Sequence, residues 1–386
     1  MAREAVIVGA VRTAIGKRNG ALSQAHAADL SGCVLRELAA RTGIEPALVD
    51  DVIWGCVGQV GDQSSNIGRY SVLAAGWPES VPGTTINRAC GSSQQALEFG
   101  FAGVISGAYD LVVAGGVEVM SRVPLGATRA GGFPYGPAVM RRYDNFEFNQ
   151  GEGAELIAER WGLSRQQLDE YASRSHELAA AAIDAGAFDS QVVPVTVPAP
   201  DGITREFKVD EGLRRGTTPE KLAQLKPSFR PDGVLHAGNS SQVSDGAAAL
   251  AITTRERAAE LGLAPIARYH TGTVAGADPV TMLTGPIPAT TRLLKKSGVR
   301  LDEIGVFEVN EAFASVPLAW RDDLGADIGK LNPLGGAIAV GHPLGASGAI
   351  LMTRMVNHMR EAGIRYGLQA MCEGGGTANA TLLELA

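Results

Sequence analysis

The sequence predicts an α/β protein made of two similar halves, with a further segment inserted into the first half. Short apolar runs alternate with helical patterns at both ends of the chain, which is typical of a largely parallel sheet covered by helices. Residues 43–52 also align without gaps with residues 298–307, and both predict a helix end, a turn and a strand. We therefore expect a structural duplication. The alternative is that any two α/β units resemble one another.

The same order of elements is expected in each half. In the first half the apolar runs predict strands at residues 5–8, 52–54 and 111–114, and the helical patterns predict helices at residues 28–40 and 93–105. In the second half they predict a strand at residues 305–309, a helix at residues 347–359 and a strand at residues 367–371. Equivalent loops of the two halves should then converge.

The middle of the chain differs in composition, being richer in Pro, Gly, Arg and acidic residues. Its one strong helix begins after Ser164, which forms a capping box with Gln167, and ends near Gly186. Residues 245–252 return to a helix-then-strand pattern. The expected domains are a first half (1–118 with 245–264), an inserted lid or substrate-binding loop domain (119–244) and a second half (265–386).

Composition excludes several classes of protein. A formal net charge of -7 over 386 residues argues against nucleic-acid or anionic-membrane partners. No uninterrupted run of about 18 apolar residues predicts a membrane helix. The four cysteines show no close pairing pattern, and no basic start precedes a long apolar stretch, so a cytoplasmic location is expected. None of the six histidines has metal-ligand spacing, so no metal is expected.

Two cysteines and a histidine lie in glycine-rich turns far apart in the chain. They are Cys90, Cys372 and His342. A thiol at a helix N-terminus beside an imidazole is activated as a nucleophile, and glycine lets a substrate approach the backbone closely. The competing interpretations are a buried inert cysteine at position 90, a structural histidine at 342, and a tight turn with an incidental thiol at 372.

Two further features have both a functional and a structural interpretation. Asn310 follows the predicted strand at residues 305–309, where functional groups of α/β folds gather, but it can also be a helix N-cap. Seven basic against four acidic side chains between Arg205 and Arg230 form either a solvated face or a landing surface for a phosphate-bearing cofactor. Neither dinucleotide nor P-loop spacing accompanies the glycine clusters.

At these residues the chain resembles the thiolase family over nearly its full length. Seven stretches in the same order carry the resemblance: residues 12–17 (Arg-Thr-Ala-Ile-Gly-Lys), 87–90 (Asn-Arg-Ala-Cys), 114–121 (Ala-Gly-Gly-Val-Glu-Val-Met-Ser), 237–241 (Ala-Gly-Asn-Ser-Ser), 310–314 (Asn-Glu-Ala-Phe-Ala), 341–343 (Gly-His-Pro) and 372–376 (Cys-Glu-Gly-Gly-Gly). The resemblance implies a thiolase-like five-layered α-β-α-β-α core from two duplicated halves with an inserted loop domain.

The resemblance also implies a role for each candidate residue. Cys90 looks like the nucleophile that becomes acylated, His342 like its base, and Cys372 like the acid/base at the acetyl carbon. Asn310 looks like the residue that holds a water in one oxyanion hole, shared with His342. The N–H groups of Cys90 and Gly374 look like the second hole.

Substrates and assembly follow from the same resemblance. Ser241 and Arg214 match loop-domain positions that contact coenzyme A, which is a substrate, and no permanently bound cofactor is implied. A homodimer or homotetramer is implied as well. The implied activity is that of an acetyl-CoA C-acyltransferase, or 3-ketoacyl-CoA thiolase, which cleaves 3-ketoacyl-CoA with coenzyme A through an acyl-cysteine intermediate.

Three departures from the family pattern affect the expected substrate. Ser93 stands where glycine is common, Glu373 stands where an apolar residue is usual, and residues 149–151 (Asn-Gln-Gly) replace the His-Met-Gly of many short-chain members. The last change favours long, branched or steroid-type acyl chains. The alternatives are a biosynthetic acetoacetyl-CoA thiolase, a ketosynthase of the same superfamily, and a non-catalytic thiolase-like lipid carrier. A ketosynthase usually has His or Asn in place of Cys372, and a carrier should have lost a catalytic residue.

Overall fold

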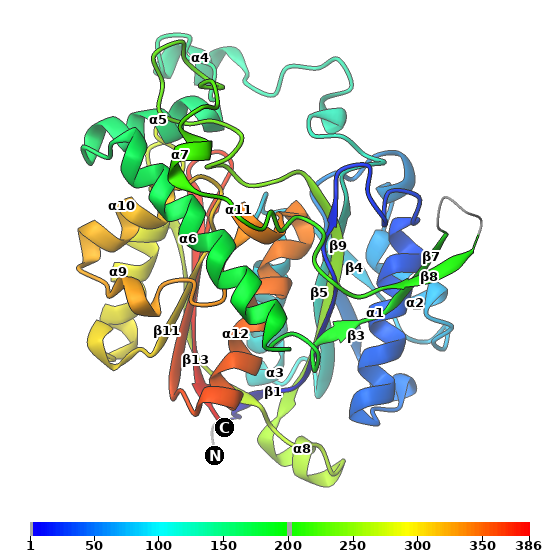
Figure 1. The fold of residues 1–386 in the computed structure, drawn as a ribbon. Coiled ribbons are helices and arrows are strands. Elements are labelled where there is room, and N and C mark those ends of the chain that lie inside the picture. Colours follow the sequence, from blue (N-terminus) through cyan, green and yellow to red (C-terminus); the bar gives the residue numbers. More distant parts are fainter. Residues whose placement is uncertain (1–2, 199–202) are drawn as a thin grey trace.

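Five layers of helices and sheet make up the protein in the computed structural model, which describes residues 3–198 and 203–386 (Figure 1). Helices α3 (Ser92–Ser106) and α12 (Ser347–Ala362) form the middle layer. A portion of sheet lies on each side of them, and further helices cover the outer face of each portion. The predicted five-layered α-β-α-β-α core is confirmed.

The main sheet is continuous among the described residues, but a narrow junction divides it into two portions. The first portion contains β1 (Ala5–Thr13), β3 (Asp51–Gly55), β4 (Thr84–Ile86), β5 (Leu111–Val119) and β9 (Ser244–Thr254). The second portion contains β10 (Ala267–Gly276), β11 (Val306–Val309), β12 (Tyr366–Glu373) and β13 (Thr377–Leu385). Only two residue pairs, Val6 with Arg268 and Ile7 with Ala267, connect β1 to β10.

The two portions repeat one topology. The strand order β3-β5-β9-β1 of the first corresponds to β11-β12-β13-β10 of the second. In each, the first two strands are parallel and joined through a middle-layer helix, and the next two pairings are antiparallel. The expectation of a largely parallel sheet is therefore wrong. The loops before α3 and α12 are therefore equivalent, as the aligned segments predict.

Apolar side chains of the first portion alternate between two cores. On β5, Val112 and Ala114 face the middle layer, whereas Leu111 and Val113 face the outer helices α1 (Ala27–Thr42) and α2 (Ile67–Ala74). Because successive strand residues point to opposite faces, a strand buried on both sides is apolar along its whole length. This explains the unbroken apolar runs that predicted these strands.

The predicted helix at the start of residues 245–252 is wrong. These residues all belong to β9, which lies between β1 and β5 and is buried along its length. Its alanines have a high intrinsic helix propensity. In a central strand, however, small side chains on both faces let the sheet pack closely against the helices, and this tertiary packing overrides the local preference.

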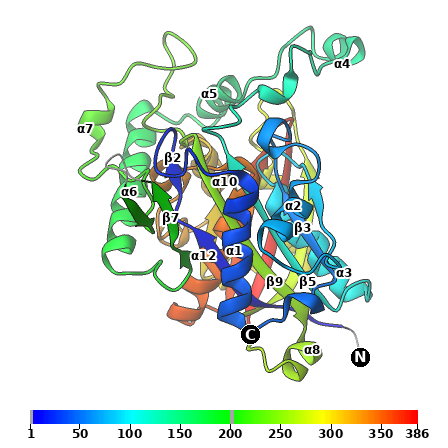
Figure 2. The same ribbon diagram turned by 90° about the vertical axis from the view of Figure 1, so that its right-hand side faces the viewer.

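Helices α3 and α12, which come from different halves, contact each other in the middle layer, whereas α1 and α2 lie on the outer face of the first sheet portion (Figure 2). The Ala349 N–H donates to Ser93 Oγ at 2.9 Å. A Cβ added to Gly348 would lie 2.3 Å from the Gln94 nitrogen, so only glycine fits there. This contact fixes the N-terminal ends of the two helices relative to each other.

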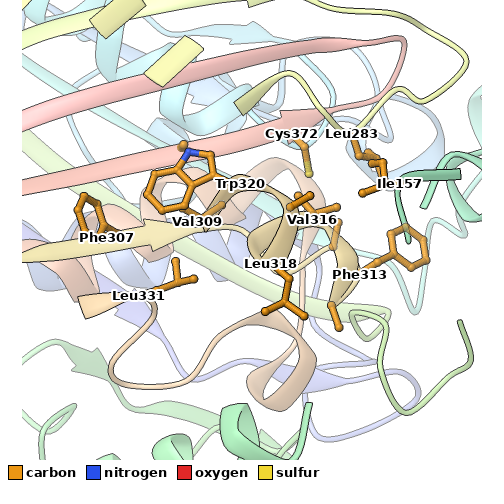
Figure 3. Close-up of a cluster of buried hydrophobic side chains, with 14 of the residues drawn as sticks. Ile157, Leu283, Phe307, Val309, Phe313, Val316, Leu318, Trp320, Leu331 and Cys372 are labelled. Atoms are coloured by element: carbon orange, nitrogen blue, oxygen red, sulfur yellow. The ribbon is translucent and has the colours of Figure 1, made fainter. Parts of the chain in front are cut away.

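The outer face of the second portion carries the largest apolar cluster around α9 (Pro286–Ser297) and α10 (Ser315–Leu324). Phe307 of β11 packs edge-to-face on Trp320 of α10, with ring centroids 5.2 Å apart. Figure 3 shows this cluster extending from Phe307 to Cys372. The end of β12 that carries Cys372 is therefore held in place by close apolar packing.

The inserted segment lies over one end of these layers (Figure 1). The helix predicted from the Ser164 capping box is confirmed as α6, Arg165–Asp184. The segment also holds elements that sequence patterns missed: α4 (Pro137–Arg142), α5 (Gln150–Arg160), α7 (Pro219–Leu222), β6 (Val192–Val193) and the hairpin of β7 (Val195–Pro198) and β8 (Thr204–Phe207). Residues 1–2 and 199–202, which belong to the predicted first half and insert, lie outside the described residues, and the predicted domain borders stay a prediction.

The remaining elements are short. They are β2 (Gly16–Lys17), α8 (Arg255–Glu260) and α11 (Ala337–Val340). Within the described part of the chain, no helix is both long and apolar enough to cross a membrane.

Candidate active site

Cys90 lies in a sharp turn between β4 and α3. Ala89 has a φ of 44°, a left-handed conformation that costs a non-glycine residue about 1–3 kcal/mol. Ser92 holds the turn, because its Oγ accepts from the Arg88 N–H at 2.9 Å and donates to the Ala89 carbonyl at 2.6 Å. The turn places the Cys90 thiol at the N-terminus of α3, where backbone N–H groups favour negative charge.

Backbone N–H groups converge on the Cys90 sulfur. Its own N–H and that of Gly374 lie near it, and they lower its pKa. Burial acts more strongly in the other direction, with help from Glu373 and Glu118, and raises the pKa of Cys90 to about 12. The resting residue is therefore a neutral thiol. An oxygen bonded near this sulfur would meet two preorganised donors.

Cys372 occupies the carboxyl-terminal end of β12, on a different strand from the turn of Cys90. Burial and the nearby Cys90 both raise the pKa of its thiol, while a hydrogen bond from the Asn310 side chain opposes this shift. Figure 3 shows its sulfur directed toward the apolar cluster that includes Val316 and Ile157. The structure thus brings the two predicted thiols together and buries both.

His342 precedes α12 at the position equivalent to Cys90. Its Nδ1 lies 2.6 Å from Ser347 Oγ, which itself donates to the Pro343 carbonyl at 2.9 Å. Since the hydroxyl hydrogen is used there, the imidazole must donate from Nδ1, and this leaves Nε2 as an acceptor. Burial lowers the pKa of His342 to about 4, so the ring is a neutral base directed into the site.

Asn310 connects the histidine to the second thiol. It directly follows β11, and its Nδ2 lies 3.4 Å from His342 Nε2. Its Oδ1 is buried and has no hydrogen-bond partner among the described residues. The alternative role as a helix N-cap is wrong, because α10 begins at Ser315 with Ala314 as its cap. Asn310 therefore has a buried oxygen, Oδ1, without a partner, while its side chain contacts both His342 and Cys372.

Glu118 holds the loops of the site together, and sequence reasoning did not single it out. Its buried carboxylate accepts from the backbone N–H groups of Val57 and Gly58 and from Gly345 of the other half. Gln63 donates to it at 2.7 Å. The sequence signal that could have identified Glu118 is a charged residue inside an otherwise apolar strand, β5. Glu118 thus ties the loop after His342 to the first half.

A cleft of about 660 Å³ lies against the segment around Gln242. Its charged lining residues are three basic ones and one acidic one: Lys17, Arg18, Arg214 and Glu211. Ser241 and Gln242 line it as well. The Gln242 carbonyl accepts from the His342 N–H at 3.0 Å, so the wall of the cleft adjoins the candidate base. The two predicted coenzyme A contacts therefore share one basic cleft, which suits a phosphate-bearing ligand.

Comparisons with known proteins agree with this geometry. The description "Thiolase, N-terminal domain" matches residues 5–256, and "Thiolase, C-terminal domain" matches residues 263–385. A steroid 3-ketoacyl-CoA thiolase of Mycobacterium tuberculosis is 49% identical, covering 99% of this chain and 94% of that protein.

Two solved structures have the same fold. The acetyl-CoA acetyltransferase of Bacillus anthracis superposes with a TM-score of 0.92 at 38% identity, covering 100% of this chain and 99% of that one. The human mitochondrial 3-ketoacyl-CoA thiolase superposes with a TM-score of 0.91 at 34% identity, with the same coverage. With both halves matched along nearly their whole length, the chain belongs to the thiolase family.

Proposed function

We propose that this protein is a 3-ketoacyl-CoA thiolase, an acyltransferase that cleaves 3-ketoacyl-CoA with coenzyme A to acetyl-CoA and a shortened acyl-CoA. The convergence of Cys90, Cys372, His342 and Asn310 in one buried site carries the proposal. A thiol–imidazole pair supports nucleophilic chemistry, and a second thiol supports proton transfer at carbon. The names of the similar proteins point to the same reaction.

The first step is acylation of Cys90. His342 Nε2 takes the thiol proton while the sulfur attacks the 3-keto carbon. Since the pKa of Cys90 is about 12 and that of His342 about 4, a free thiolate–imidazolium pair is disfavoured, and the proton leaves as the new C–S bond forms. The bond between the second and third carbons then breaks, which leaves an acyl-cysteine and the enolate of acetyl-CoA.

The next steps quench the enolate and release the acyl group. The Cys372 thiol gives its proton to the enolate carbon, and a second coenzyme A then takes the acyl group from Cys90. Asn310 and His342 stabilise the enolate oxygen in one oxyanion hole. The N–H groups of Cys90 and Gly374 donate to the oxygen of the acyl group attached to Cys90 in the second hole. Losing one donor of this kind typically costs about 2.7–4 kcal/mol of transition-state stabilisation.

The inferred acyl group is long, branched or ring-bearing. Gln150 begins α5, and its Nε2 lies 3.4 Å from where a Cβ on Gly374 would be. The residue that departs from the short-chain pattern thus lies beside the catalytic loop, whereas Asn149 caps α5 through its side chain. The steroid thiolase relative supports a bulky substrate.

The proposed function is tested by comparing thiolysis of acetoacetyl-CoA with that of a ring-bearing 3-ketoacyl-CoA. We expect acetyl-CoA from both and at least a roughly ten-fold higher kcat/KM for the bulky substrate, about 1.4 kcal/mol of discrimination. A strong preference for acetoacetyl-CoA would instead support the biosynthetic thiolase. If neither substrate is cleaved and no acyl adduct forms, the lipid-carrier alternative prevails.

Arg214 is proposed to bind the phosphate groups of coenzyme A in the basic cleft. Replacing Arg214 by alanine should raise the KM for coenzyme A by about ten-fold with little change in kcat, because a charge-assisted contact is lost away from the reacting atoms. Arg215 offers a matched control, since its guanidinium is engaged by Asp184. Steady-state kinetics of the two variants would contradict the assignment if both changed KM equally.

A homodimer or homotetramer is part of the proposal. Strand β4 lies at the edge of the sheet, pairing with β3 on one side, and an open edge can pair with another chain. Light scattering on the purified protein measures the assembly directly.

A further inference from the structure

A buried carboxylate that the proposed mechanism does not use lies next to the two thiols. Glu373 ends β12, directly after Cys372, and its side chain has no solvent exposure. Thr377 Oγ1 donates to Glu373 Oε2 at 2.6 Å across the hairpin. The other oxygen, Oε1, has no hydrogen-bond partner among the described residues. Burying a carboxylate oxygen without a hydrogen bond or a paired charge is costly.

The unpartnered oxygen lies against the start of α3. A Cβ added to Gly91 would be 2.1 Å from Glu373 Oε1, so the carboxylate touches the residue that follows Cys90. Gly91 is also the N-cap of α3. The positive end of this helix favours a thiolate at Cys90, and a negative carboxylate beside it cancels part of that effect.

The other groups around Glu373 are few among the residues that the structure describes. Arg88 Nη1 lies 3.8 Å from Oε2 and is one-third exposed. On β13, Thr377 and Asn379 are neutral. On α3, Glu98 is the titratable side chain, and it is engaged by Tyr269 and Thr381. Cys372 is on the same strand, and Glu118 is the other carboxylate acting on Cys90. Among these groups, only Arg88, which is one-third exposed, therefore offsets the charge of Glu373.

We propose that Glu373 is a positioning residue whose buried carboxylate opposes the N-terminus of α3 and so restrains the reactivity of Cys90. The inference rests on the proposed function, in which Cys90 is the nucleophile. An ionised Glu373 keeps Cys90 as a thiol and makes a free thiolate rarer. A neutral Glu373 leaves the helix end unopposed and makes Cys90 more reactive.

The restraint should operate near neutral pH. Burial raises the pKa of Glu373 to about 7, against the hydrogen bond from Thr377 and the charge of Arg88. As the pH rises through this range, Glu373 ionises and Cys90 becomes harder to ionise. The two titrations are coupled, so the logarithm of Cys90 reactivity should rise with pH at a slope below one around pH 7.

The test is alkylation of the full-length protein by iodoacetamide, followed at the Cys90 peptide by mass spectrometry from pH 6 to 9. Glu373→Gln removes the charge and keeps the shape. It should speed alkylation of Cys90 by about ten-fold above pH 7, equivalent to about one pKa unit, and restore a slope of one. Glu98→Gln is the matched control, because it removes a partly buried carboxylate of α3 that is engaged by Tyr269 and Thr381, and it should leave both the rate and the slope unchanged.

A second variant keeps the test decisive if Glu373→Gln fails to fold. Thr377→Val removes the hydrogen bond that favours the ionised carboxylate, so alkylation near pH 7 should again be faster than in the unmodified protein. Unchanged or slower alkylation in the folded variants would overturn the inference. Alkylation measures the reactivity of Cys90 without any substrate. Failure to cleave 3-ketoacyl-CoA would therefore refute the proposed function, and the alkylation rates would still test the role of Glu373.

Discussion

Replacing Cys90 by alanine is expected to lower thiolysis by about 10⁴-fold or more, because removal of a covalent nucleophile leaves only binding and oxyanion stabilisation. Intact mass after mixing with a 3-ketoacyl-CoA should show an acyl adduct on the unmodified protein and none on the variant. The fold should survive, since the turn is held by Ser92 rather than by the thiol.

Cys33 provides the control for this experiment. It lies on α1 as a free and partly exposed cysteine. Cys33→Ser should retain both turnover and the adduct, which excludes a general effect of removing a thiol. Substantial residual thiolysis in Cys90→Ala would refute the covalent role and with it the proposed mechanism.

Cys372→Ala should slow exchange of the acetyl α-protons of acetyl-CoA with solvent by about 10²–10⁴-fold, the usual contribution of a positioned acid/base. Exchange in deuterated water, followed by NMR, measures this step directly. Transfer of an acetyl group from acetyl-CoA to labelled coenzyme A should persist, because it needs only Cys90 and His342. The variant thus separates the two half-reactions.

The matched control is Cys56→Ala. Cys56 is also buried, but its sulfur contacts Glu118 and Gln63 rather than Asn310 or Cys90. Its variant should exchange α-protons at a rate close to that of the unmodified protein. If Cys372→Ala kept the full exchange rate, another group would have to carry the proton, and the assignment would be wrong.

Local patterns predicted those elements and residues whose signals lie within a few positions of one another. The capping box of α6 involves Ser164 and Gln167, three residues apart, and it forms as predicted. Asn310 was placed correctly because the end of a strand is itself a local feature. By contrast, the alanine-rich β9 looks helical in isolation, and only its neighbours on both sides make it a strand.

The interactions that sequence reasoning missed involve backbone groups, both distant and near in the chain. Glu118 accepts hydrogen bonds from Gly345, 227 positions away, and the tautomer of His342 depends on the hydrogen bond of Ser347 to Pro343. Both partners use backbone atoms, which carry no signature of their own in a sequence. The equivalence of the Cys90 and His342 loops followed from the duplicated pattern, and the pairing of Cys90 with Cys372 followed from the family resemblance. The structure places the two thiols near enough for Cys90 to raise the pKa of Cys372.

The close contact of α3 with α12 makes the two halves interdependent. The middle layer draws apolar side chains from both, such as Phe101 of α3 and Met355 of α12, so either half alone would expose a face that the other normally covers. The separation of Cys90 from His342 is then set by how near two helices can come, with Gly348 at their crossing. Catalytic competence therefore arises from the joint folding of both halves, and a protein cut between them would regain it only by reassembly.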